Sequence, residues 1–210
     1  MRVLLASASE RRFACLLEFI DKKELLVQPL FGDEKSMRTK ESVEKQVGKI
    51  CLSKAKMAAI EWSIIEEEKK ECPEIIIVSD TIVEDPEDSM IPMGKPKTHF
   101  QATNMLIKLS GKRHKVWSST ALLVKKREEY EHLHGKWRYR IWTNHSVVEF
   151  EEMSDEEIIS LVQSNSWVGK AGGYDLAGMA GEYTKLIEGD ELTVLGLSQD
   201  AIFELKNSLL

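Results

Sequence analysis

Two serines and two arginines directly follow the first apolar run of the chain. The run Val3–Ala6 has the character of a buried strand. It is followed, where a helix is expected to begin, by Ser7, Ser9, Arg11 and Arg12. A helix N-terminus has unpaired N–H groups and a partial positive charge, and hydroxyl and guanidinium donors add directional hydrogen bonds. This segment therefore predicts a phosphate-binding site. The alternative is a serine N-cap with two surface arginines.

A lysine lies within an apolar helical stripe. If residues 41–71 form a helix, a rotation of about 100° per residue places Lys54 in the middle of an apolar arc. The arc consists of Val47, Ile50, Cys51, Met57 and Ala58. Burying an ammonium group without a partner is costly, so Lys54 must reach solvent, pair with a carboxylate or face an anion-binding cleft. Lys95, in the tight turn Gly94-Lys95-Pro96, is a second candidate, with an exposed turn lysine as the alternative.

Carboxylates lie near or just after the ends of two expected strands. Asp80 comes near the end of the apolar strand 74–83, which places it at the rim of a sheet, where α/β sheets bind ligands. A carboxylate there suits a divalent metal ion or a general base. Glu34, or its neighbour Asp33, could complete an oxygen-ligand site for Mg²⁺ with substrate phosphates and water. The alternatives are a turn at Asp33-Glu34 and a cap at Asp80.

The elements that must position these residues alternate between strands and helices. The expected strands cover residues 2–6, 25–31, 74–83, 116–124, 139–150, 183–187 and 192–195. The expected helices cover residues 10–20, 41–71, 98–110 and 154–162, and a last helix starts at residue 198. The charged segment 125–138 predicts a hairpin excursion of low order. Because neither a linker nor a repeat divides the chain, we expect one α/β domain over residues 1–210.

Composition excludes several classes of protein. The 210 residues are 42% hydrophobic and have a formal net charge of -6, which argues against coating nucleic acid and favours a small phosphorylated metabolite. The three cysteines are widely spaced, and no apolar run is long enough for a bilayer, so we expect reduced thiols, no membrane partner and a cytoplasmic location. Neither a Walker A loop, a Rossmann glycine fingerprint nor a nucleophile elbow is present.

Taken together, several segments resemble, in the same order, the Maf family of nucleoside triphosphate pyrophosphatases, first named for septum formation. They are Leu5–Arg12, Lys54-Ala55, Ser79–Val83, Gly94–Pro96, Met105–Gly111, Lys170–Tyr174 and residues 187–198. The resemblance implies an α/β fold with an elongated mixed sheet flanked by helices. It also implies two lobes with a central cleft, similar to inosine triphosphate pyrophosphatases.

The resemblance further implies a chemistry and a set of functional residues. The reaction is metal-dependent hydrolysis of the bond between the α and β phosphates, giving a nucleoside monophosphate and pyrophosphate. Carried over by motif, the functional positions are Ser7, Arg11, Arg12, Glu34, Lys54, Asp80 and Lys95, to which the phosphate argument adds Ser9. Glu34 and Asp80 would bind Mg²⁺, Mn²⁺ or Co²⁺, and Asp80 would activate the attacking water. A homodimer is the family expectation.

The chain departs from the family pattern at three places. Glu10 stands where the family usually has proline, Ala177 stands where it usually has a functional glutamine, and the segment 125–138 is longer than usual. Arg11 is similar to the branch that acts on dTTP and UTP, since the branch that acts on 7-methyl-GTP has an aromatic residue there. The alternative prediction is a catalytically weak, nucleotide-binding regulator of cell division, motivated by Ala177 and Glu10.

Overall fold

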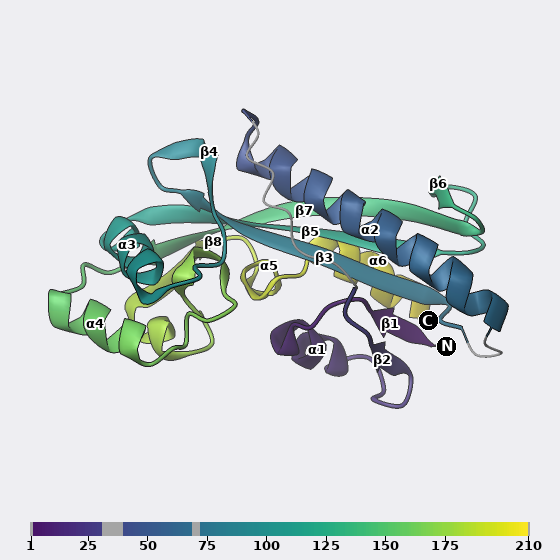
Figure 1. Ribbon diagram of the computed structural model, residues 1–210, viewed down its shortest axis with the longest axis horizontal. Helices are drawn as coiled ribbons and strands as arrows, with labels where there is room; N and C mark the ends of the chain where they lie inside the picture. Colours follow the sequence, from purple (N-terminus) through teal and green to yellow (C-terminus); the bar gives the residue numbers. More distant parts are fainter. Residues whose placement is uncertain (1, 31–39, 69–71, 210) are drawn as a thin grey trace.

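The computed structural model describes residues 2–30, 40–68 and 72–209, and its centre is one long sheet (Figure 1). The strands are β1 (Val3–Leu5), β2 (Leu25–Val27), β3 (Ile75–Asp85), β4 (Asp88–Met93), β5 (Arg113–Val124), β6 (Glu131–His134), β7 (Trp137–Phe150) and β8 (Thr184–Glu188). The main path is β2-β1-β3-β5-β7-β6, with β4 paired to β3 and β8 paired to β7. β1 pairs in parallel with β2 and β3, and the other pairs are antiparallel.

Helices cover this sheet, as Figure 1 shows. They are α1 (Glu10–Leu17), α2 (Val43–Glu68), α3 (His99–Leu109), α4 (Asp155–Gln163), α5 (Glu191–Leu195) and α6 (Gln199–Leu209), with the 3-10 turns η1 (Ala171–Gly173) and η2 (Met179–Tyr183). The predicted α/β mixed sheet flanked by helices is confirmed. Within the described residues, no helix combines the length and the apolar character that crossing a membrane requires.

At the end of the sheet that holds both termini, two hydrophobic clusters lie on opposite faces (Figure 1). Successive strand residues point to opposite faces. Leu4 and Ile76 therefore pack beneath α2, which presents the small side chains of Ala55 and Ala58. The neighbouring residues of the same strands pack against α1 and α6 on the other face.

A third cluster fills the opposite end of the molecule. Leu106 of α3, Leu161 of α4 and Phe150 of β7 meet there with Tyr174, which directly follows η1. The long strands β3, β5 and β7 extend from one packed end to the other, so any site between the two ends is held by continuous strands.

The edge of β3 has an interruption between these two ends. β1 pairs with Ile75–Ile77, and β4 pairs with Val83–Asp85. Residues 78–82 lie between these two partners along the same strand. The prediction that Asp80 lies near the end of its strand is wrong, because pairing with β5 continues through Val83 and β3 ends at Asp85. Asp80 is instead in mid-strand, beside the interruption.

Three other segments differ from the sequence-based expectation. Residues 192–195, expected as a strand, belong to helix α5, because Asp190 caps its N-terminus and Gly196 ends it in the left-handed conformation. Residues 88–93, which were not among the expected strands and helices, form β4 at the edge of the sheet, where proline is tolerated. In the segment 125–138 the expected hairpin is present, since β6 pairs with the start of β7, but the expected low order is wrong, because Trp137 is fully buried.

Candidate functional site

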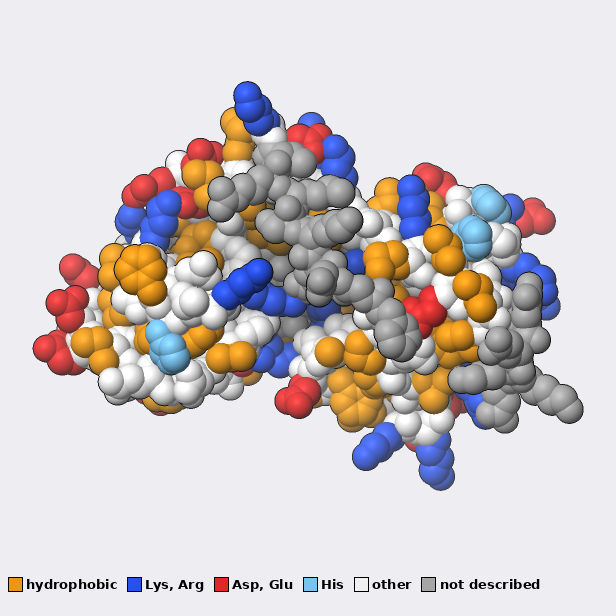
Figure 2. All heavy atoms as spheres, viewed as in Figure 1, with side chains coloured by type: hydrophobic (Ala, Val, Ile, Leu, Met, Phe, Trp, Pro, Cys, Tyr) orange, Lys and Arg blue, Asp and Glu red, His pale blue; other side chains and the backbone are white. Residues whose placement is uncertain are grey.

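A cleft of about 470 Å³ lies beside the interruption in β3. The predicted site residues that line it are Ser7, Ser9, Arg11, Arg12, Lys54, Asp80 and Lys95. Figure 2 shows Lys and Arg side chains gathered in the middle of this face, between the two packed ends. Glu34, the remaining predicted site residue, lies outside the described residues, as does its neighbour Asp33.

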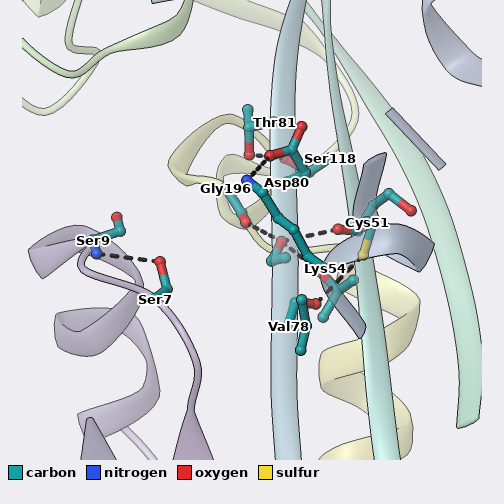
Figure 3. Close-up of polar contacts among 12 residues, drawn as sticks. Ser7, Ser9, Cys51, Lys54, Val78, Asp80, Thr81, Ser118 and Gly196 are labelled. Carbon is teal, nitrogen blue, oxygen red and sulfur yellow. Dashed lines mark hydrogen bonds and ion pairs between the residues drawn. The ribbon is translucent and has the colours of Figure 1, made fainter. Parts of the chain in front are cut away.

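The loop before α1 forms one wall of the cleft. Ser9 is the N-cap of α1, since its hydroxyl accepts a hydrogen bond from Arg12 N at 3.4 Å. The Ser9 N–H in turn donates to Ser7 Oγ at 3.2 Å (Figure 3). The capping alternative therefore holds for Ser9, but the cap also lines the cleft, because strand β1 leads into the helix directly beside β3.

Arg12 connects this wall to the interrupted edge of the sheet. Its Nη1 donates to the carbonyl oxygen of Ser79 at 2.9 Å and to Ser7 Oγ at 3.1 Å. Its Nη2 donates to Thr81 Oγ1 at 2.9 Å, and its Nε donates to the carbonyl oxygen of Gly196 at 2.8 Å. Arg12 thus supplies a donor to a β3 carbonyl in the stretch between β1 and β4, and it is fixed by four protein acceptors.

Lys54 of α2 and Asp80 of β3 meet on the face of β3 that α2 covers. Lys54 extends from α2 so that its Nζ lies 2.5 Å from Asp80 Oδ1 (Figure 3). Their side chains are 19% and 12% exposed, so water screens this ion pair only weakly. Two of the three arrangements considered for Lys54, pairing with a carboxylate and facing a cleft, are present together.

The thiol nearest to this pair is unsuited to nucleophilic chemistry. Cys51 is fully buried, and its Sγ lies 3.6 Å from the carbonyl oxygen of Val78. Burial, with the Asp80 carboxylate as a smaller contribution, raises the pKa of the Cys51 thiol to about 12. The thiolate is the nucleophilic form, so Asp80 is the better candidate for activating a water molecule.

A second ion-pair cluster lies on the far wall. Arg11 Nη1 donates to Asp175 Oδ1 at 3.0 Å, and Lys170 Nζ lies 3.3 Å from Asp175 Oδ2. Both cations line the cleft. Sequence reasoning quoted Lys170 within a motif but gave it no role, and it missed Asp175. The feature of the sequence that could have pointed to these two residues is the glycine-rich segment 172–181. It forms a loop that packs near α1 although it is distant from α1 in the sequence.

The two departures from the family pattern occupy different places. Glu10 is exposed at the start of α1 and lines the cleft. Ala177 is exposed and is absent from the cleft lining, and its N–H donates to Asp175 Oδ1 at 3.1 Å.

Comparisons of the sequence and of the structure find proteins that are similar to this chain. A family model described as "Maf-like protein" matches residues 2–209. The chain is 33% identical to a dTTP/UTP pyrophosphatase of Clostridium botulinum over 199 residues, which cover 94% of this chain and 93% of that protein. It is 31% identical to a dTTP/UTP pyrophosphatase of Clostridium novyi over 205 residues, covering 98% and 96%. Among solved structures, the Staphylococcus aureus Ham1 protein aligns at 14% identity over 100% of this chain and 98% of that one, with a TM-score of 0.49.

Proposed function

This chain belongs to the Maf family, and from that premise we propose that it is a nucleoside triphosphate pyrophosphatase. The reaction is hydrolysis of the bond between the α and β phosphates, which releases a nucleoside monophosphate and pyrophosphate. The names of its relatives support dTTP and UTP as substrates, and so does Arg11. The observation on which the proposal rests is the Lys54–Asp80 pair, held at 2.5 Å inside a cationic cleft.

Charge supports a polyanionic substrate. The whole chain has a net charge of -6, yet the described lining of the cleft contains five basic side chains and two carboxylates. The basic side chains are Arg11, Arg12, Lys54, Lys95 and Lys170, and the carboxylates are Glu10 and Asp80. A cleft with an excess of one sign concentrates ligands of the opposite sign, and a triphosphate has the required charge.

Each residue has a role that follows from its contacts. Asp80 is the proposed base: Lys54 occupies Oδ1, so Oδ2 is the oxygen that would take a proton from the attacking water. Lys54 keeps this carboxylate oriented, and it offsets phosphate charge together with Lys95 and Arg11. Ser7, Ser9 and the first N–H groups of α1 would orient the phosphate chain. Arg12 would hold the two walls of the cleft in register.

The donor set fits a hard divalent cation. Such an ion takes one or two protein carboxylates and obtains its other ligands from phosphate oxygens and water. Asp80 supplies one carboxylate in the cleft, and Glu34 is the proposed second. Mg²⁺, Mn²⁺ or Co²⁺ at this position would polarise phosphate oxygens and offset their charge.

The proposal also includes the protein's setting. We place the activity in the cytoplasm and expect a homodimer, as in the family, with neither nucleic acid nor membrane as a partner. The acidic net charge supports the exclusion of nucleic acid.

A nucleotide panel tests the proposal. The protein is incubated with each common ribonucleoside and deoxyribonucleoside triphosphate in the presence of Mg²⁺, Mn²⁺ or Co²⁺, and pyrophosphate release is measured. We expect turnover to be highest with UTP and dTTP. Folded protein that releases no pyrophosphate from any nucleotide with any of the three ions would refute the proposal. If that protein nevertheless binds nucleotides tightly, the result would support the alternative function, a nucleotide-binding regulator of cell division.

A further inference from the structure

The carboxylate of Asp175 lies between two cations of the cleft. Its Oδ1 accepts from Arg11 at 3.0 Å, and its Oδ2 lies 3.3 Å from Lys170 Nζ. The side chains of Asp175, Arg11 and Lys170 are 15%, 23% and 25% exposed. Each oxygen therefore neutralises one cation in a setting where solvent screens the charges only partly.

The protein holds this carboxylate in place independently of the two cations. Asp175 Oδ1 also accepts the Ala177 N–H at 3.1 Å, which closes a short turn. The preceding residue, Tyr174, is buried, and its hydroxyl lies 2.8 Å from His114 Nε2 of β5. The anion is thus attached to the packed end of the molecule and does not depend on Arg11 for its position.

The position of Asp175 relative to the cleft gives it an electrostatic effect. Arg11 and Lys170 line the cleft, and Asp175, which is not among the lining residues, pairs with both of them. The three groups together present a net charge of +1 where the two cations alone would present +2. An entering polyphosphate therefore meets cations that already have an anionic partner.

Arg11 differs from Arg12 in how completely its donors are used. Arg12 has four protein acceptors, whereas the Nε of Arg11 is buried with no acceptor among the described residues. A buried donor without a partner is unfavourable, so the protein satisfies the guanidinium of Arg11 less completely than that of Arg12. Arg11 is therefore the arginine whose hydrogen bonding can change when an anion binds.

We propose that Asp175 is an internal competitor of the anionic substrate: it acts through Arg11 and Lys170 and weakens the affinity of the cleft for polyphosphates. This inference rests on the proposed function and concerns how tightly the same cleft binds its substrate and its product. A weaker hold on polyphosphate applies to the product pyrophosphate as well as to the triphosphate, so Asp175 favours product release. Asp175 is a positioning residue that tunes the two cations, and it need not touch the substrate.

Asp175→Asn separates this effect from a structural one. The amide removes the charge, but its oxygen still accepts the Ala177 N–H, whereas Asp175→Ala removes both. The probes are inorganic tripolyphosphate and pyrophosphate, with binding measured by calorimetry on the full chain. We expect both variants to bind the two anions about three- to tenfold more tightly than the wild type, and added salt to shrink the difference. Glu149→Gln is the matched control, because it removes one charge from an exposed ion pair with Arg113 outside the cleft.

Several outcomes would overturn the proposal. The first is that Asp175→Asn binds the two anions no more tightly than the wild type, and the second is that only Asp175→Ala binds them more tightly. The others are that Glu149→Gln gains as much affinity as the Asp175 variants, and that no form of the protein binds either anion. A kinetic measurement adds an independent check: KM and the inhibition constant of pyrophosphate should fall together in Asp175→Asn without a rise in kcat. Because anion binding needs no turnover, a wild type that hydrolyses nothing would refute the proposed activity and still leave the binding comparison decisive.

Discussion

At the scale of single residues, the proposed activity depends on Lys54 of α2 and Asp80 of β3, whose Nζ and Oδ1 atoms lie 2.5 Å apart. Two motifs that are separate in the sequence thus form one chemical unit. The geometry gives each partner a use that neither has alone, because the ammonium orients the carboxylate beside the place where phosphate charge would be offset.

Asp80→Asn tests the carboxylate. The amide keeps the volume and can still accept from Lys54, but it can neither take a proton from water nor bind a cation strongly. We expect turnover to fall by roughly two to four orders of magnitude while the protein stays folded. Steady-state pyrophosphate release and thermal unfolding measure the two effects.

Asp85→Asn is the contrast on the same strand. The Asp85 carboxylate is buried and paired with Lys108. Loss of the Asp85 charge should lower the free energy of unfolding and leave the turnover of folded molecules unchanged. Near-normal turnover in Asp80→Asn would remove Asp80 from its assigned role.

Lys54→Met tests the ammonium. The substitution leaves the Asp80 carboxylate without the Lys54 ammonium. In a closed core such a loss would destabilise the protein strongly, but the destabilisation should be smaller here, because Asp80 borders a cleft that admits water. We expect a loss of about 1–2 kcal/mol in the free energy of unfolding and a fall in turnover of at least about tenfold. Lys56→Met, an exposed lysine on the same helix, should change neither quantity. A destabilised Lys54→Met protein with full turnover per folded molecule would contradict the cleft assignment.

Sequence patterns singled out Lys54 and Asp80 as candidates, but they did not single out Asp175. Lys54 was conspicuous because a charge on an apolar stripe needs an explanation. Asp175 was not, because an aspartate in a glycine-rich loop has the ordinary explanation of a turn. Its ion pairs with Arg11 and Lys170 depend on how two ends of the chain pack together, which local patterns do not encode.

At the scale of elements, the interruption between β1 and β4 along β3 creates the site. Arg12 reaches this edge, and the Gly196 carbonyl accepts both from Arg12 and from the Ser79 hydroxyl, at 2.8 and 2.7 Å. Gly196 has a φ of +110°, and a Cβ there would approach Arg12 Nε to 2.9 Å. The residue that ends α5 is therefore also part of the frame that positions Arg12.

Gly196→Ala should disturb that frame. Strain at positive φ, together with the close approach to Arg12, should cost about 1–3 kcal/mol of stability. Gly94→Ala is the control, because a Cβ at that position meets no described atom within 4 Å. Thermal unfolding of both variants measures the difference, and equal stability would show that Gly196 has no special conformational role.

A buried histidine links β5 to the loop that holds Asp175. Burial lowers the pKa of His114 from 6.5 to about 4. Between these values the unfolded chain binds a proton that the folded protein does not, so stability should fall as pH drops from about 6.5 to 4, by up to about 3 kcal/mol. Urea unfolding of the wild type and of His114→Gln across this range measures the effect. Parallel pH profiles of the two proteins would contradict it.

Helices and strands that are long, or that begin at a recognisable capping residue, were easier to predict from the sequence than short ones. Helices α3 and α4 begin at capping residues that the sequence displays, and their apolar stripes fix their extent. Helix α5 has only five residues, Glu191–Leu195, too few to show a helical period, so its apolar run was wrongly predicted as a strand. β4 was missed because it is stabilised by pairing with β3, which a loop rich in proline does not reveal.

At the scale of the whole molecule, residues from two packed ends line the cleft. The two ends share the long strands of one sheet (Figure 1). Ser7, Ser9 and Arg12 come from the end that holds the termini, and Lys170 with Asp175 comes from the other. The order of strands and helices predicted the fold class. The position of the site was only approximately predicted, because the interruption in β3 arises from long-range pairing.

The sharpest test of the claim that this chain hydrolyses the bond between the α and β phosphates is the identity of the two products formed from UTP in a single ³¹P NMR time course. Hydrolysis between the α and β phosphates yields uridine monophosphate and pyrophosphate in equal amounts from the first turnover, and that is the result we expect from the wild type. Uridine diphosphate with orthophosphate, or pyrophosphate without matching monophosphate, would contradict the claim.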